Sequence, residues 1–291
     1  MLTHLYDTII DVSSGNPLWY TSLFQLWRQR ESAIHNGWRI LRLGAVTVLG
    51  LVVLVALTAE SGRLFSQFLE VGLLGIFAFM LAADALHMLI SLGKMRQHFH
   101  DEQWDMLRAT TIQGQTMLDA YYASLQVQVW YVMIAEMAAR VALGMLALGA
   151  ILVGVGQAAG GPVPVVCLPI YVASPAFTIA FVMIVSLLEA WWRMRAVVAV
   201  GLWLSMRIRT QAAALMFGMA IIMVIHMAQL MICTPLIALV QSNQRAPQNT
   251  SDFLIPMYTA IIGGMIYFGL RALRNIALCA SAKRILAAES E

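Results

Sequence analysis

Long apolar blocks alternate with short polar segments along the chain. A helix needs about 20 apolar residues to cross the hydrocarbon core of a membrane. Six blocks approach or exceed that length: 43–59, 71–92, 133–155, 165–188, 212–240 and 253–270. The pattern predicts an all-α integral membrane protein with six transmembrane helices, which form one transmembrane domain over residues 43–270.

The composition supports this prediction. Hydrophobic residues make up 60% of the 291 residues and charged residues only 11%, whereas soluble domains carry about 25% charged residues. We therefore expect the lipid bilayer to be the main solvent of the chain, and we expect no nucleic-acid partner. The three cysteines are scattered singly, which predicts neither a disulfide framework nor a metal site.

The basic residues predict the orientation, because Lys and Arg accumulate in cytoplasmic loops. They cluster before the first block and after the second, fourth and sixth blocks, and the other loops hold only Arg63 and Arg245. The clustered residues are Arg28, Arg30, Arg39, Arg42, Lys94, Arg96, Arg108, Arg193, Arg195, Arg207, Arg209, Arg271, Arg274, Lys283 and Arg284. Both termini are therefore predicted to be cytoplasmic, with residues 1–42 before the spans and residues 271–291 as a C-terminal tail.

Two polar stretches are predicted to form amphipathic helices. Asn16 and Pro17 suit the start of a helix, and the Trp and Arg residues that follow favour the membrane interface. A second, cytoplasmic helix is expected over about 101–111, where Trp104 and Leu107 share one face. A helix this short needs a surface to bury that face. The candidate surfaces are the membrane, the ends of the protein's own helices and a cytoplasmic partner.

Three segments resemble the permease subunit of exporter-type (type 2) ABC transporters. NPLWYTSLFQLWRQRE resembles the interfacial elbow helix, DEQWDMLRATTIQ the coupling helix, and GLWLSMRIRTQAAAL the segment leading into span five. The usual Gly-Thr of the coupling helix is replaced by Gln103 and Trp104, and the usual Pro by Thr111. The resemblance implies that a cytoplasmic ATPase docks on the coupling helix, through Glu102, Trp104, Asp105, Leu107 and Arg108.

The resemblance also implies a dimer, formed with a second copy or with a similar permease, in a prokaryotic cytoplasmic membrane. The chain contains no G-x-x-x-x-G-K-[ST] loop. ATP would therefore bind a separate subunit, and we expect neither enzymatic activity nor a cofactor in this chain. The predicted function is that of the membrane-spanning permease of an ATP-driven exporter.

Charged and polar residues inside the predicted spans are costly and therefore raise the question of function. Asp84 and His87 are three residues apart, and Glu136–Arg140 and Glu189–Arg193 are spaced for pairing along one helix turn. These pairs either satisfy one another locally or line a polar path through the bundle. The predicted intramembrane polar set is Asp84, His87, Glu136, Arg140, Glu189 and His226.

Two alternatives stay open at this point. His87 or His226 would suit ligation of a haem or a chlorophyll-type pigment. The chain would then be a non-transporting scaffold subunit of a larger respiratory or photosynthetic membrane complex, which its Trp-rich interfacial segments would also suit. A membrane enzyme is not favoured, because no motif supplies a nucleophile with its base or a paired-carboxylate site.

Overall fold

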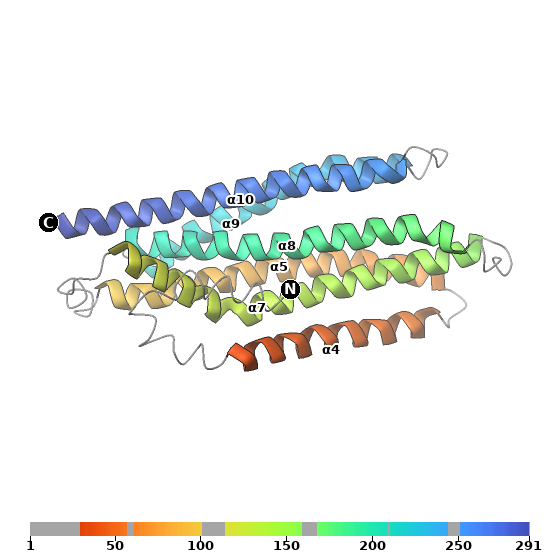
Figure 1. Cartoon of the computed structure of the whole chain (residues 1–291), viewed down its shortest axis with the longest axis horizontal. Coiled ribbons are helices and arrows are strands. Elements are labelled where there is room, and N and C mark those ends of the chain that lie inside the picture. The colour runs from red at the N-terminus through yellow and green to blue at the C-terminus, as the bar shows by residue number, and fades with distance from the viewer. Residues whose placement is uncertain are drawn as a thin grey trace.

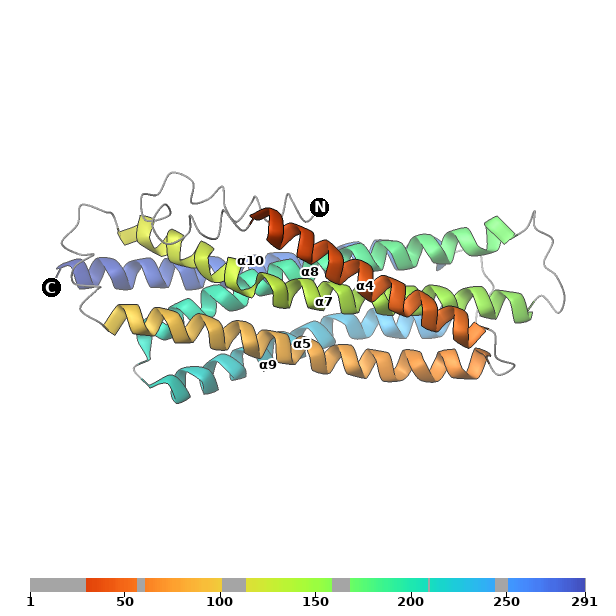
Figure 2. The ribbon, with the colours of Figure 1, turned by 90° about the horizontal axis from the view of Figure 1, so that it is seen from below.

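The structure is a computed structural model that describes residues 30–56, 61–100, 114–158, 168–208, 210–243 and 251–290. Every element in these ranges is an α-helix. The helices run side by side along one long axis, and successive helices point in opposite directions (Figures 1 and 2). They are α4 (Arg30–Ala56), α5 (Ser61–His100), α7 (Gly114–Ala158), α8 (Leu168–Arg207), α9 (Gln211–Asn243) and α10 (Ser251–Ser290).

Five of the helices in these ranges, α5 and α7 to α10, are long and apolar enough to cross a membrane. The all-α membrane architecture predicted from the sequence is therefore confirmed. The helix α4 overlaps the first predicted block, 43–59, but is not among the five. The count of six spans and the cytoplasmic placement of both termini stay predictions. The predicted interfacial helix before residue 30 lies outside the described residues.

The helices extend far beyond the predicted apolar blocks. The helix α7 begins at Gly114, although the block begins at 133, and α8 ends at Arg207, although the block ends at 188. The predicted C-terminal tail continues α10 as far as Ser290. With 45 residues, α7 is about 68 Å long, roughly twice the hydrocarbon thickness of a bilayer. The helices therefore continue beyond the predicted apolar blocks at this end of the bundle, which is the left end of Figures 1 and 2.

The helix α8 occupies the centre of the bundle. It packs against α10, α7 and α5, while α4 packs on the outer side of α7 (Figure 1). The core between α7 and α8 includes an edge-to-face contact of Trp130 with Trp191, whose ring centroids are 6.5 Å apart. Trp130 and Met194 are almost completely inaccessible.

One close approach in this core depends on a glycine. A Cβ atom added to Gly201 of α8 would lie 2.6 Å from the Cβ of Ser91 on α5. Carbon atoms in contact normally stay about 3.5–4.0 Å apart, so only glycine fits at this position. Gly263 of α10 makes a second close approach, because an added Cβ would lie 2.7 Å from Cγ1 of Val185 on α8.

Candidate functional site: a buried ionic cluster

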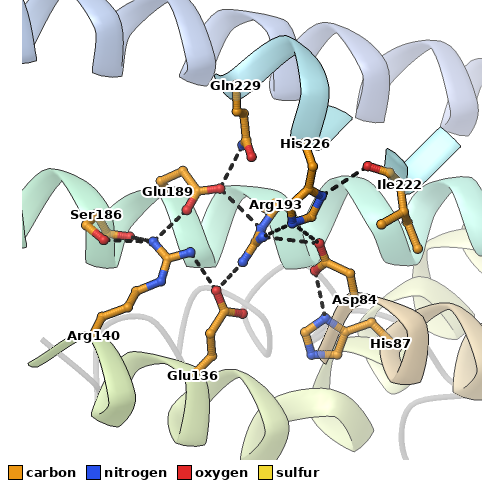
Figure 3. Close-up of polar contacts among 10 residues, drawn as sticks. All are labelled: Asp84, His87, Glu136, Arg140, Ser186, Glu189, Arg193, Ile222, His226 and Gln229. Atoms are coloured by element: carbon orange, nitrogen blue, oxygen red, sulfur yellow. Dashed lines mark hydrogen bonds and ion pairs between the residues drawn. The ribbon is translucent and has the colours of Figure 1, made fainter. Parts of the chain in front are cut away.

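Four helices each contribute two polar side chains to one buried cluster (Figure 3). Seven of these side chains are buried in the bundle and Gln229 is half-buried, although charged groups are strongly disfavoured in such an interior unless they are paired. We call this set the buried ionic cluster. It consists of Asp84 and His87 of α5, Glu136 and Arg140 of α7, Glu189 and Arg193 of α8, and His226 and Gln229 of α9.

Arg193 is the centre of the cluster and has no exposed surface. Its Nη1 lies 3.2 Å from Oδ2 of Asp84, and its Nε lies 3.1 Å from Oε1 of Glu189. Its Nη2 donates to Oε1 of Glu136. One guanidinium therefore contacts carboxylates from α5, α7 and α8, as its planar array of five N–H donors permits.

Arg140 makes a second set of contacts between α7 and α8. Its Nη2 lies 2.6 Å from Oε1 of Glu136, and its Nη1 lies 2.6 Å from Oε2 of Glu189. Nη1 also donates to the backbone carbonyl and, at 2.9 Å, to the hydroxyl of Ser186. Glu136, Arg140, Glu189 and Arg193 thus form a closed ring in which negative and positive groups alternate, and we call it the alternating ring.

His226 joins the cluster from α9 in a defined tautomer. Its Nδ1 lies 3.0 Å from the carbonyl oxygen of Ile222, and a carbonyl can only accept, so Nδ1 carries a proton. Its Nε2 lies 3.0 Å from Nη1 of Arg193. Arginine can only donate, so Nε2 accepts. These two contacts describe a neutral imidazole, whose ring also packs edge-on against Phe77.

Asp84 and His87 are less completely satisfied than the alternating ring. Nδ1 of His87 lies 3.7 Å from Oδ1 of Asp84, which is an ionic contact but exceeds hydrogen-bond distance. Neither ring nitrogen of His87 and neither oxygen of Asp84 has a hydrogen-bond partner, although both side chains are buried. Glu189, by comparison, also accepts a hydrogen bond of 2.8 Å from Gln229.

The cluster lies well inside the apolar parts of the helices. Asp84 is near the midpoint of the candidate span Leu74–Gly93, and the other members lie within Thr116–Gly149, Phe177–Arg207 and Gln211–Ile232. Water is scarce at this depth, so each charge depends on its protein neighbours for stabilisation.

The structure brings together all six residues of the predicted intramembrane polar set. The local pairs Glu136–Arg140 and Glu189–Arg193 are both confirmed. Arg193 was counted among the basic residues that flank span four, and this placement was wrong because Arg193 lies fully inside the bundle. The sequence carried one signal of its role: Asp84 has no Lys or Arg within a helical turn, so an arginine partner has to come from another helix.

The predicted docking residues, Glu102, Trp104, Asp105, Leu107 and Arg108, lie outside the described residues. Within the described ranges, no three His, Cys, Asp or Glu side chains are grouped in a way that would hold a metal ion. The arrangement suits ionic pairing that changes with helix position or protonation.

Comparison with models of protein families, with curated proteins and with solved structures finds no match for this chain.

Proposed function

We propose that this chain is the membrane-spanning permease subunit of an ATP-driven exporter in which a separate subunit hydrolyses ATP. The observation that carries the proposal is the buried ionic cluster, which joins four helices within their apolar spans. Replacing a buried ion pair by well-packed apolar residues is often neutral or stabilising. Stability alone is therefore a poor explanation for such a cluster. Charges inside a membrane commonly mark transport pathways or switching elements.

The cluster suits a switch because Arg193 contacts carboxylates on α5, α7 and α8. When one helix shifts, Arg193 can keep some carboxylate partners and lose others. The helices can therefore pack in a few discrete arrangements rather than in a continuous range of positions. Alternating access requires at least two such packings. Each exchange leaves no charge unpaired as long as one carboxylate replaces another.

The connection between α5 and α7 gives a partner subunit a route to the cluster. The helix α5 ends and α7 begins at the end of the bundle where α8 ends and α9 begins (Figure 1). From His100 back to Asp84 is about 24 Å of continuous helix, and from Gly114 to Glu136 about 33 Å. Movement of the predicted coupling helix would therefore be transmitted to both sides of Arg193.

The first test is to purify the protein from its native membrane in mild detergent and to identify the chains that remain bound in stoichiometric amounts. We expect one to carry a G-x-x-x-x-G-K-[ST] loop. The complex is then reconstituted in liposomes with the double substitution Trp104→Ala and Leu107→Ala, which should uncouple ATP hydrolysis from transport. The matched control is Trp38→Ala with Leu43→Ala, which removes the same side-chain types from exposed positions on α4.

The opposite result would favour the scaffold alternative. Electron-transfer or pigment-binding partners without an ATPase would contradict the permease proposal, as would unchanged coupling in the Trp104 and Leu107 variant. Haem or pigment ligation by His226 is not part of our proposal, because its Nε2 already contacts Arg193. Ligation by His87 belongs to the scaffold alternative. Pairing with a second copy and location in a prokaryotic cytoplasmic membrane belong to the permease proposal and share its tests.

A further inference from the structure

We propose that Asp84 and His87 form a proton-binding site within the membrane, and that His87 is an imidazolium when the cluster is in the packing described here. This inference concerns the charge balance of the bundle and stands whether or not the chain is a transport subunit. The two side chains are 1% and 0% exposed, so bulk water does not stabilise either charge.

The charge balance of the cluster identifies Asp84 as the carboxylate in excess. The alternating ring holds two carboxylates and two guanidiniums and is neutral by itself. Asp84 adds one negative charge and no positive one. With both histidines neutral the cluster would carry a net charge of −1 in an environment where an uncompensated charge is very costly. One bound proton removes that charge.

Neither His226 nor the ring is suited to hold this proton. Nε2 of His226 lies 3.6 Å from Oδ2 of Asp84 but only 3.0 Å from Nη1 of Arg193. A proton on this nitrogen would therefore bring two donors and two positive charges face to face. Glu136 accepts from both Arg140 and Arg193 through Oε1, and Glu189 faces the same two guanidiniums. Both glutamates are therefore best satisfied as carboxylates.

His87 has the geometry that the ring residues and His226 lack. Its Nδ1 is directed at Oδ1 of Asp84, and neither of its ring nitrogens has another partner (Figure 3). Arg193 from α8 and His226 from α9 approach Asp84 at its other oxygen, Oδ2, and Glu136 of α7 faces Arg193 from its far side. A protonated Nδ1 would therefore meet a carboxylate oxygen that no other group occupies.

The ligand is a proton rather than a metal cation. Hard cations such as sodium or calcium need several oxygen ligands, and the open position beside Asp84 faces an imidazole. The described residues also offer no group of three potential metal ligands. When His87 is protonated, Asp84 has two positive partners, His87 on its own helix and Arg193 on α8. When His87 loses the proton, Arg193 is the single charged partner of Asp84. Proton binding would thereby adjust the contact between α5 and α8.

Nitrogen NMR of the full-length chain in lipid bilayers, with ¹⁵N-labelled histidine, tests the proposal directly. A neutral imidazole shows one protonated and one bare nitrogen, whereas an imidazolium shows two protonated ones. At about pH 7.5, where an unperturbed histidine is mostly neutral, we expect one imidazolium signal. It should disappear in His87→Gln and persist in His35→Gln, which alters an exposed histidine on α4.

The substitution Asp84→Asn provides a second test and leaves the alternating ring balanced. In this variant His87 should lose its proton, so the imidazolium signal should be replaced by that of a neutral ring. An absent imidazolium signal in the wild-type protein would overturn the proposal. A signal that survives His87→Gln or Asp84→Asn would overturn it as well. If one variant fails to fold, the other assigns the signal, and an absent wild-type signal overturns the proposal without either variant.

Discussion

Nη1 of Arg140 on α7 lies 2.6 Å from Oε2 of Glu189 on α8. Each of the two residues also pairs along its own helix, Arg140 with Glu136 and Glu189 with Arg193. The cross-helix contact therefore joins two ordinary intrahelical pairs into the alternating ring. Because every member has at least two partners of opposite charge, removing one side chain affects both helices at once.

Removing the central arginine is expected to be severely destabilising. Arg193→Met keeps a long side chain but leaves three buried carboxylates facing one guanidinium. Breaking a buried pair in this way typically costs about 3–5 kcal/mol. The measurement is the free energy of unfolding in bilayer-like micelles. The control is Arg284→Met, an exposed position near the end of α10 that should change little. Equal effects of the two substitutions would contradict the central role of Arg193.

The contact between Glu136 and Arg193 predicts strong coupling between these two residues. Glu136→Gln combined with Arg193→Met leaves Arg140 and Glu189 as a balanced pair, so the double variant should be more stable than the sum of the two single changes predicts. Energies of about 0.5–3 kcal/mol are usual for residues in one ionic network. A double-mutant cycle measures the difference, and pairing Glu136→Gln with Arg284→Met should give simple additivity. Additivity in the first cycle would mean that the contact carries no coupling energy.

The sequence predicted the ionic pairs within single helices but not the contacts between helices. Spacing along a helix places Glu136 beside Arg140 and Glu189 beside Arg193, whatever the rest of the fold does. The depth at which α5, α7, α8 and α9 align depends on side-chain packing across the whole bundle, and one sequence does not show it. Arg193 was placed among the flanking residues because its neighbours Trp191, Trp192 and Arg195 are typical of a membrane interface.

The ends of the helices were not predicted for a different physical reason. Hydropathy detects where a helix becomes polar enough to leave the lipid, but a helix does not end there. In α7 and α8 the backbone continues as a helix through segments that bury one face against neighbouring helices, such as Tyr122, whose hydroxyl donates to the carbonyl of Arg195. Burial against another helix replaces burial in lipid, and an apolar block does not report it.

The contact of Gly201 with Ser91 predicts a position that tolerates no side chain. In Gly201→Ala the new methyl group would lie 2.6 Å from the Cβ of Ser91, so α5 and α8 would have to separate. Overpacking of this kind usually costs about 1–3 kcal/mol. Gly264→Ala is the matched control, since nothing lies within 4 Å of its added Cβ. The melting temperature should fall in the first variant and stay constant or rise in the second, because alanine favours the helix. A similar melting temperature for both variants would show that α5 and α8 separate easily.

The predicted orientation can be tested with single cysteines at the two ends of the bundle. In a variant without Cys167, Cys233 and Cys279, cysteines are placed at Gly160 and, separately, at Ser290. Ser290 ends α10 at the same end of the bundle as the α8–α9 connection, and the uncharged loop around Gly160 is predicted to be external. A membrane-impermeant thiol reagent added to intact cells should label the cysteine at 160. The cysteine at 290 should react only after the cells are opened. Labelling of both positions from outside would mean that the chain crosses the membrane an even number of times between them, so that α8, α9 and α10 do not all span it. That result would also place the cytoplasmic end of the helices, and with it the proposed ATPase contact, on the wrong side.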